Sequence, residues 1–179
     1  MLQKRYEQDS SYKMKPKYMS DKALSEMYSA RPVTSSDVIF FQRAPKAVFL
    51  TTRIIIPGEG LWVVGGARKA GETATETITR RVKTETSLEI DEDRFIFLGI
   101  IEYIWPYRLQ PPSNEGRHDI NYVFGLEVTD EELTAATSNL DPEEYDTKAG
   151  FRRFNSVNEL EAAGVRQNII DYYTELFKR

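Results

Sequence analysis

The chain has 179 residues with 24 Lys and Arg against 28 Asp and Glu, so its length suits one domain plus an extension. Its formal net charge of −4 gives no general support for nucleic-acid binding. It has no cysteine and a single histidine, His118, which excludes disulfides, thiolate metal sites, cysteine nucleophiles and any site that needs two imidazoles. Chemistry here must depend on carboxylates, Tyr, Lys and Arg, a set that is compatible with a hard metal such as Mg²⁺.

Two features of the sequence bear on location. No apolar run approaches the length of a membrane span, so we expect no membrane partner. The N-terminal residues lack the apolar segment of a secretory signal peptide, so we expect a cytoplasmic protein.

We predict one domain over residues 31–179, preceded by an N-terminal extension over residues 1–30. Residues 1–19 are polar and without apolar periodicity, which predicts a tail or a loosely docked arm. Ser20 is a suitable N-cap for a short helix that ends before Pro32.

The domain itself begins with strands. Residues 37–41 and 47–53 predict a hairpin, and residues 61–64 predict a third strand that ends in a double glycine. Thr73 and Glu76 form a capping-box pattern that opens a helix to residue 86. Further strands are predicted over 95–105, 120–128 and 151–155, followed by helices over 156–164 and 166–177. This order predicts an α+β fold rather than a regular βαβ repeat.

The informative segment joins the third strand to the first helix of the domain. From the second glycine the chain has the spacing G-x5-E-x7-R, given by Gly66, Glu72 and Arg80, and Glu85 follows on the helix. Glycines let the backbone approach an anion, and a helix presents carboxylates at fixed spacing to Mg²⁺. The segment resembles the Nudix box, and Gly60-Leu61-Trp62 before it is also typical of that family. The resemblance implies the Nudix fold, a mixed β-sheet sandwiched between helices.

The chain departs from the box at several positions. Arg81 and Thr84 stand where the family has glutamates, and Ser87 stands where it has glycine. We interpret Arg81 and Thr84 as part of a solvated helix face, with Arg81 able to pair with Glu85 four residues on.

Among Nudix proteins, the GDP-mannose mannosyl hydrolases lack the same two glutamates, and the chain resembles them from about residue 30 to 173. That resemblance implies a diphosphate site on Arg53 and Arg80. It also implies substrate contacts from Asp37, from Arg68, which lies one residue beyond the family position, and from Tyr103, where the family has histidine.

The same resemblance implies one Mg²⁺ held by the Gly65 carbonyl, Glu85 and an acid of the loop over residues 140–146. That loop supplies the family's general base. The candidates for catalysis here are Glu144, Asp146 and Tyr145, with Glu144 also a metal-ligand candidate. An unperturbed tyrosine, with a pKa of about 10, is a poor base at neutral pH.

The expected function is Mg²⁺-dependent hydrolysis of a nucleoside-diphosphate sugar, GDP-mannose-like, by attack of water at the anomeric carbon. The products would be the free sugar and the nucleoside diphosphate, and we expect a homodimer. Two alternatives remain open: a conventional Nudix pyrophosphohydrolase that cleaves the P–O–P bridge, and a non-catalytic Nudix module that binds a nucleotide.

Overall fold

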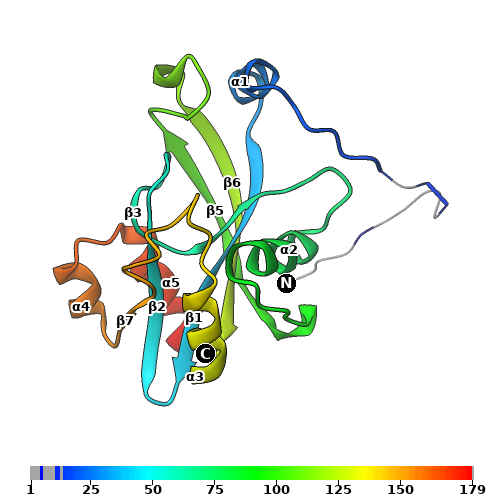
Figure 1. The fold of residues 1–179 in the computed structure, drawn as a ribbon. Coiled ribbons are helices and arrows are strands. Elements are labelled where there is room, and N and C mark those ends of the chain that lie inside the picture. Colours follow the sequence, from blue (N-terminus) through cyan, green and yellow to red (C-terminus); the bar gives the residue numbers. More distant parts are fainter. Residues whose placement is uncertain (1–4, 6–10, 13, 179) are drawn as a thin grey trace.

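The computed structural model describes residues 5, 11–12 and 14–178 (Figure 1). The strands are β1 (Val33–Arg43), β2 (Lys46–Arg53), β3 (Gly60–Trp62), β4 (Val64–Ala67), β5 (Phe95–Trp105), β6 (Arg117–Glu127) and β7 (Arg152–Phe154). The helices are α1 (Asp21–Ala30), α2 (Ala74–Thr86), α3 (Asp130–Ser138), α4 (Val157–Ala162) and α5 (Gln167–Lys178). Short 3₁₀ turns lie at Glu92–Arg94 and Ser113–Glu115.

The strands form a mixed sheet in the order β3-β2-β1-β6-β5. β1 runs parallel to β6, and the other pairs are antiparallel. One edge of β1 pairs with β6. Along the opposite edge, the first half of β1 pairs with β4 and its last residues pair with β2. The two neighbours of β1 therefore separate, and the pocket described below opens beside β4.

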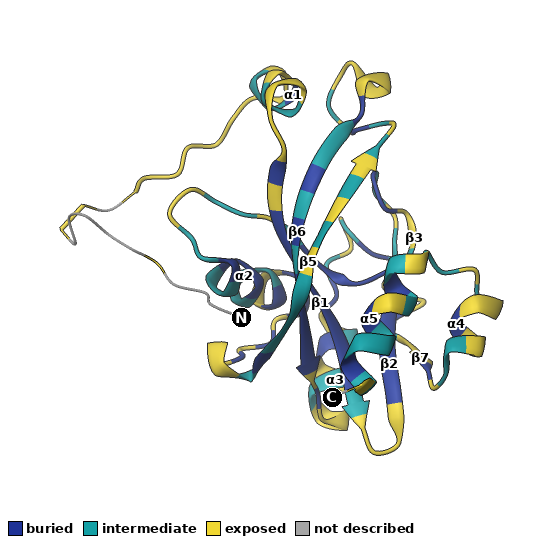
Figure 2. Cartoon of the chain, turned by 180° about the vertical axis from the view of Figure 1, so that it is seen from behind, coloured by how far each residue is buried: buried dark blue, intermediate teal, exposed yellow. Residues whose placement is uncertain are grey.

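Strand β1 explains why helices cover both faces of the sheet. Val38 and Phe40 pack on one side with α2 and α3, whereas Ile39 and Phe41 pack on the other side with α4 and α5. A continuous apolar run buried on both faces is what a central strand requires. Figure 2 shows β1 and β2 as largely buried strands with α5 in front of the sheet, while α1 lies at the other end of the molecule and is partly exposed. The predicted α+β sandwich is confirmed.

Three differences from the predicted elements have local causes. The strand predicted over 61–64 is two short strands, because β3 pairs with β2 and β4 with β1. Helix α3 was not predicted, although Thr129 and Glu132 form a capping box at its start. At α4, the sequence pattern of Ser156 and Glu159 predicts a capping box. The Ser156 hydroxyl does cap the helix, but the Glu159 carboxylate accepts from the Asn155 amide, so the box is not completed.

The N-terminal expectations are only partly covered by the structure. The predicted tail over residues 1–19 falls partly outside the described residues. Helix α1 begins as predicted, with the Ser20 hydroxyl accepting from the Ala23 amide. In the part of the chain that is described, no helix combines the length and the hydropathy that crossing a membrane would require.

The loop between β4 and α2 is held by an ion pair. Arg80 donates from Nε and Nη2 to the two carboxylate oxygens of Glu72, at 2.6 and 2.8 Å, and from Nη2 to the Ala67 carbonyl at 3.1 Å. Partial burial opposes ionisation of Glu72, but hydrogen bonds from Arg80 and the Lys69 amide outweigh it and lower the Glu72 pKa to about 2. This pair therefore fixes the loop against the helix.

We expect the substitution Glu72→Gln to lower the free energy of unfolding at pH 7 by about 1–3 kcal/mol, because it removes a charge-assisted bidentate contact. The folded-state pKa of Glu72 lies below its ordinary value of 4.5, so its ionised form favours the folded chain above that pH. The difference between the wild type and the variant should therefore shrink as the pH falls from 4.5 towards 2.

Urea denaturation at several pH values measures this difference. The exposed Glu161 supplies the control, since Glu161→Gln should change stability little at any pH. A Glu72→Gln deficit that does not change with pH would contradict the assignment of the stabilisation to the ionised Glu72.

Candidate active site

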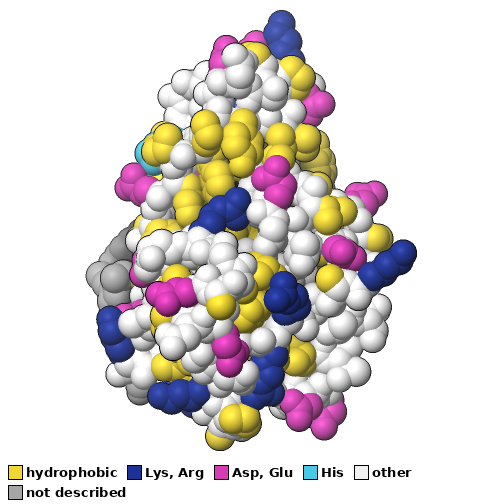
Figure 3. Space-filling view, turned by 90° about the vertical axis from the view of Figure 1, so that its left-hand side faces the viewer, with side chains coloured by type: hydrophobic (Ala, Val, Ile, Leu, Met, Phe, Trp, Pro, Cys, Tyr) yellow, Lys and Arg dark blue, Asp and Glu magenta, His cyan; other side chains and the backbone are white. Residues whose placement is uncertain are grey.

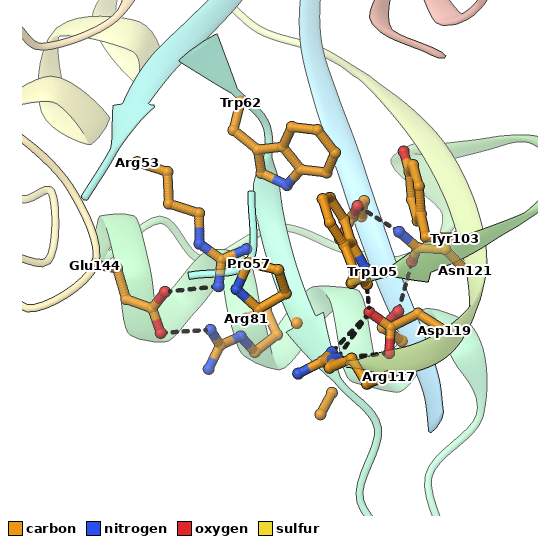
Figure 4. A pocket seen from close by; sticks show the side chains of 14 residues that line it. Arg53, Pro57, Trp62, Arg81, Tyr103, Trp105, Arg117, Asp119, Asn121 and Glu144 are labelled. Atoms are coloured by element: carbon orange, nitrogen blue, oxygen red, sulfur yellow. Dashed lines mark hydrogen bonds and ion pairs between the residues drawn. The ribbon is translucent and has the colours of Figure 1, made fainter. Parts of the chain in front are cut away.

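A pocket of about 220 Å³ lies where β4 and the ends of β2 and β3 face β5 and β6 (Figure 4). Its walls combine two arginines and a glutamate on one side with aromatic rings on the other, and a polar network at the base. On the face of the molecule seen in Figure 3, basic and acidic side chains are interspersed around a band of hydrophobic ones. The arginines of the pocket therefore do not belong to a wider basic surface on that face, and the carboxylates of Asp37, Asp119 and Glu144 lie among them.

Two arginines from different elements meet at one carboxylate. Arg53, at the end of β2, contacts Glu144 at 3.3 Å, and Arg81, on α2, contacts it at 3.2 Å (Figure 4). The loop that carries Glu144 is itself hydrogen-bonded to the end of β2, since its carbonyl accepts from the Ile54 amide at 2.9 Å. The sheet edge, the helix and the loop thus place two cations side by side.

The Arg81 guanidinium has two further partners. Its Nε and Nη2 donate to the Gly65 carbonyl at 3.2 and 3.1 Å, and Nη2 forms an ion pair with Glu85 one turn along the helix. A Cβ on Gly66 would lie 2.6 Å from Arg81 Nε, so the absence of a side chain at this position lets the guanidinium rest on the β4 backbone. Arg81 is not on a solvated helix face: its side chain is only 21% exposed.

Glu85 is buried beneath this guanidinium, with a side chain only 1% exposed. Its Oε2 accepts from the Tyr145 hydroxyl and from the Gly65 amide, while its Oε1 faces Arg81 as an ion pair without hydrogen-bond geometry. Burial raises the pKa of Glu85 to about 7, although Arg81 and Tyr145 oppose the shift. The guanidinium stays protonated and touches Oε1, so it favours the ionised form of the Glu85 carboxylate.

The three oxygen donors expected to hold Mg²⁺ are indeed close together. The Gly65 carbonyl, Glu85 and Glu144 all contact the same group, but that group is the Arg81 guanidinium. Within residues 5, 11–12 and 14–178, no group of three or more His, Cys, Asp or Glu side chains is arranged to hold a metal ion. With Arg81 in this position, the residues present do not fit a divalent metal.

An aromatic wall faces the arginines. Trp62, Tyr103 and Trp105 pack against one another, with ring centroids 5.1 to 6.1 Å apart. The Arg166 guanidinium lies over both tryptophans, at 5.2 and 5.6 Å from the ring centroids. The Tyr103 hydroxyl is hydrogen-bonded to that of Tyr172 on α5 at 2.8 Å, which fixes the ring.

The base of the pocket is a polar network on neighbouring strands. Asp37, on β1, accepts from the Asn121 side-chain amide, and Ser35 donates to the Asn121 carbonyl oxygen at 2.9 Å. Burial raises the pKa of Asp37 to about 6, despite the opposing effect of Asn121. Alongside, Asp119 accepts from Arg117 at 2.8 Å and from the Trp105 indole at 2.9 Å.

The predicted site residues divide into three groups according to their place in the structure. Asp37, Arg53, Tyr103 and Glu144 line the pocket, and Gly65, Glu85 and Tyr145 lie behind it. The remaining three are engaged elsewhere, in contacts that hold loops together; they are Arg68, which donates to the Glu72 carbonyl, Arg80, which pairs with Glu72, and Asp146, which accepts from the amides of Lys148 and Ala149.

Several pocket residues were not predicted as functional: Arg81, Trp62, Trp105, Arg117, Asp119 and Asn121. The sequence does contain a signal for a role of Arg81. This arginine replaces a glutamate of the Nudix box, and it lies four residues before Glu85, the helix glutamate of the box that the chain keeps. Trp62 belongs to the Gly60-Leu61-Trp62 pattern, which gave it no role of its own. For the residues of β5 and β6 no pattern was available, because their convergence depends on the register of those two strands.

Comparison with known proteins places the chain in a family. The model of the NUDIX domain matches residues 32–175, and no curated protein matches the chain. Among solved structures, a mutT/nudix family protein from Listeria innocua is similar at 18% identity and a TM-score of 0.53, over 83% of this chain and 94% of that one. An Ap4A hydrolase binary complex from C. elegans is similar at 10% identity and a TM-score of 0.52, over 82% and 96%.

A MutT/nudix family protein from Enterococcus faecalis is similar at 16% identity and a TM-score of 0.50, over 80% of this chain. The chain spans only 47% of that protein's length. At these identities the structural neighbours show a shared fold, and the family match covers most of the chain. The chain therefore belongs to the Nudix hydrolase family.

Proposed function

We propose that this protein hydrolyses a nucleoside-diphosphate sugar, releasing the sugar and the nucleoside diphosphate. The observation that carries the proposal is the pairing of Arg53 and Arg81 across one carboxylate, opposite an aromatic wall. The arrangement offers cations to a diphosphate and flat surfaces to a base or sugar.

The arginines would bind the diphosphate and stabilise it as a leaving group. A guanidinium binds two oxygens of an anion at once, and two guanidinium groups side by side match the oxygens of adjacent phosphates. Attack at the anomeric carbon leaves the phosphorus atoms untouched, so the developing charge is on the departing diphosphate. The two fixed guanidinium groups stabilise that charge, and the proposed reaction does not use the Mg²⁺ that the resemblance implies.

Glu144 is the candidate general base. In the structure its carboxylate holds Arg53 and Arg81, and a bound diphosphate would compete for both guanidinium groups. Displacement from the arginines would free the carboxylate to accept a proton from water. The water oxygen then bonds to the anomeric carbon, the bond from that carbon to the phosphate oxygen breaks, and the nucleoside diphosphate leaves with the electron pair.

Two other functions remain as alternatives. Cleavage of the P–O–P bridge is the ordinary reaction of the family. Binding of a nucleotide without turnover is favoured by one specific observation: Arg81 holds the three oxygen donors at which a metal would act. The products distinguish the three functions, because only anomeric hydrolysis releases free sugar.

We expect Arg53→Lys to weaken nucleoside-diphosphate binding by about tenfold or more, because lysine keeps the charge but loses the bidentate fork. The two tryptophans of the chain both line the pocket, so intrinsic fluorescence reports binding. Arg152→Lys, at an exposed position on β7, is the matched control. Equal affinity for the Arg53→Lys variant and the wild type would remove the bidentate argument.

We expect hydrolysis of a nucleotide sugar in ¹⁸O-labelled water to place the label in the released sugar. The substitution Glu144→Gln should slow this reaction by roughly 100-fold or more, because it removes the general base. The adjacent, exposed Glu143 supplies the control variant Glu143→Gln. Label in a phosphate product would mean attack at phosphorus, and the proposed reaction would be wrong.

A further inference from the structure

The partners of Arg81 carry an inference about how the site binds its ligand. Nudix hydrolases generally use a divalent metal, and here the positions expected to hold one surround a guanidinium. The contacts come from three separate elements: the Gly65 carbonyl on β4, Glu85 on the same helix, and Glu144 in a distant loop.

We propose that the Arg81 guanidinium takes the place of the divalent metal, so that this pocket binds the diphosphate of a nucleotide without one. This inference rests on the proposed function for the identity of the ligand. The replacement of the metal is inferred from the contacts of Arg81 alone.

The first support is that the guanidinium is built into the fold. Gly66 leaves room for it on the backbone, where a Cβ would lie 2.6 Å from Nε and 2.8 Å from Cζ. The carboxylate beneath it is already engaged on its other oxygen by the Tyr145 hydroxyl and the Gly65 amide. Glu85 is thus held in an orientation that serves Arg81.

The second support is charge. A divalent ion among the same three oxygens would lie within a few ångströms of a guanidinium that cannot lose its proton, and like charges at such distances repel strongly in a partly buried site. Removing Arg81 would reverse the situation, because the buried Glu85 and the Gly65 carbonyl would lose their only cation among the described residues and Glu144 would keep only Arg53. Hard oxygen donors of this kind are the ligands that Mg²⁺ and Mn²⁺ prefer.

The test uses Mn²⁺ as the probe, in the absence of any nucleotide, with the full chain. Binding is measured by the loss of the free Mn²⁺ electron paramagnetic resonance signal and by calorimetry. We expect no specific Mn²⁺ binding to the wild type, and a gain in affinity of about tenfold or more in Arg81→Ala and in Arg81→Glu. The double variant Arg81→Ala/Glu85→Gln should lose the gain.

Lys83→Ala is the matched control, since it removes an exposed cation from the same helix and should create no metal site. Circular dichroism checks that each variant is folded. If Arg81→Ala or Arg81→Glu does not fold, Arg81→Gln is used in its place. Specific Mn²⁺ binding by the wild type that Glu85→Gln abolishes would overturn the inference, and so would folded Arg81 variants with no gain.

A second arm separates this inference from the proposed function. Tryptophan fluorescence follows nucleoside-diphosphate binding to the wild type in EDTA and in excess Mg²⁺, and we expect affinities that agree within about twofold. Binding that requires Mg²⁺ would overturn metal independence while leaving the choice of ligand intact. Absence of nucleotide binding in both conditions would instead contradict the proposed function, and the Mn²⁺ measurements would still decide the role of Arg81.

Discussion

The contacts of one guanidinium organise this site. Arg81 joins the backbone of β4, the buried Glu85 of its own helix and Glu144 of the loop before β7, and Glu144 in turn holds Arg53. A buried carboxylate is costly unless a cation or hydrogen bonds compensate it. Glu85 has both, so the helix, the sheet edge and the loop are held together by charge compensation at a single point.

This arrangement gives a physical reason for the departures from the Nudix box. A glutamate at position 81 would place a third carboxylate beside Glu85 and Glu144, and Arg53 alone could not compensate three negative charges. An arginine there supplies a permanent charge and, together with Arg53, faces the pocket. The opposite wall of tryptophan and tyrosine rings provides an apolar surface, which suits the base or sugar of the proposed ligand.

Much of the fold followed from local sequence. The capping box at Thr73, the apolar run of β1 and the hairpin before Arg53 each specify structure through neighbouring residues, and all are present. The site was less predictable. The interpretation of Arg81 as solvated was wrong, since spacing along a helix shows the partner Glu85 but not Gly65 or Glu144, which the fold brings from elsewhere. Arg80 is a different case: this motif position pairs with Glu72, a contact that the spacing did not indicate, and its role towards a substrate stays a prediction.

The most direct test of a guanidinium in place of a metal is a crystal structure of the protein grown with a nucleoside diphosphate and Mn²⁺, with data collected for the anomalous signal of manganese. The account predicts the diphosphate on Arg53 and Arg81, with the Arg81 contacts to Gly65 and Glu85 kept and no anomalous peak between Gly65, Glu85 and Glu144. A manganese peak among those three residues, with the Arg81 side chain turned away, would contradict it.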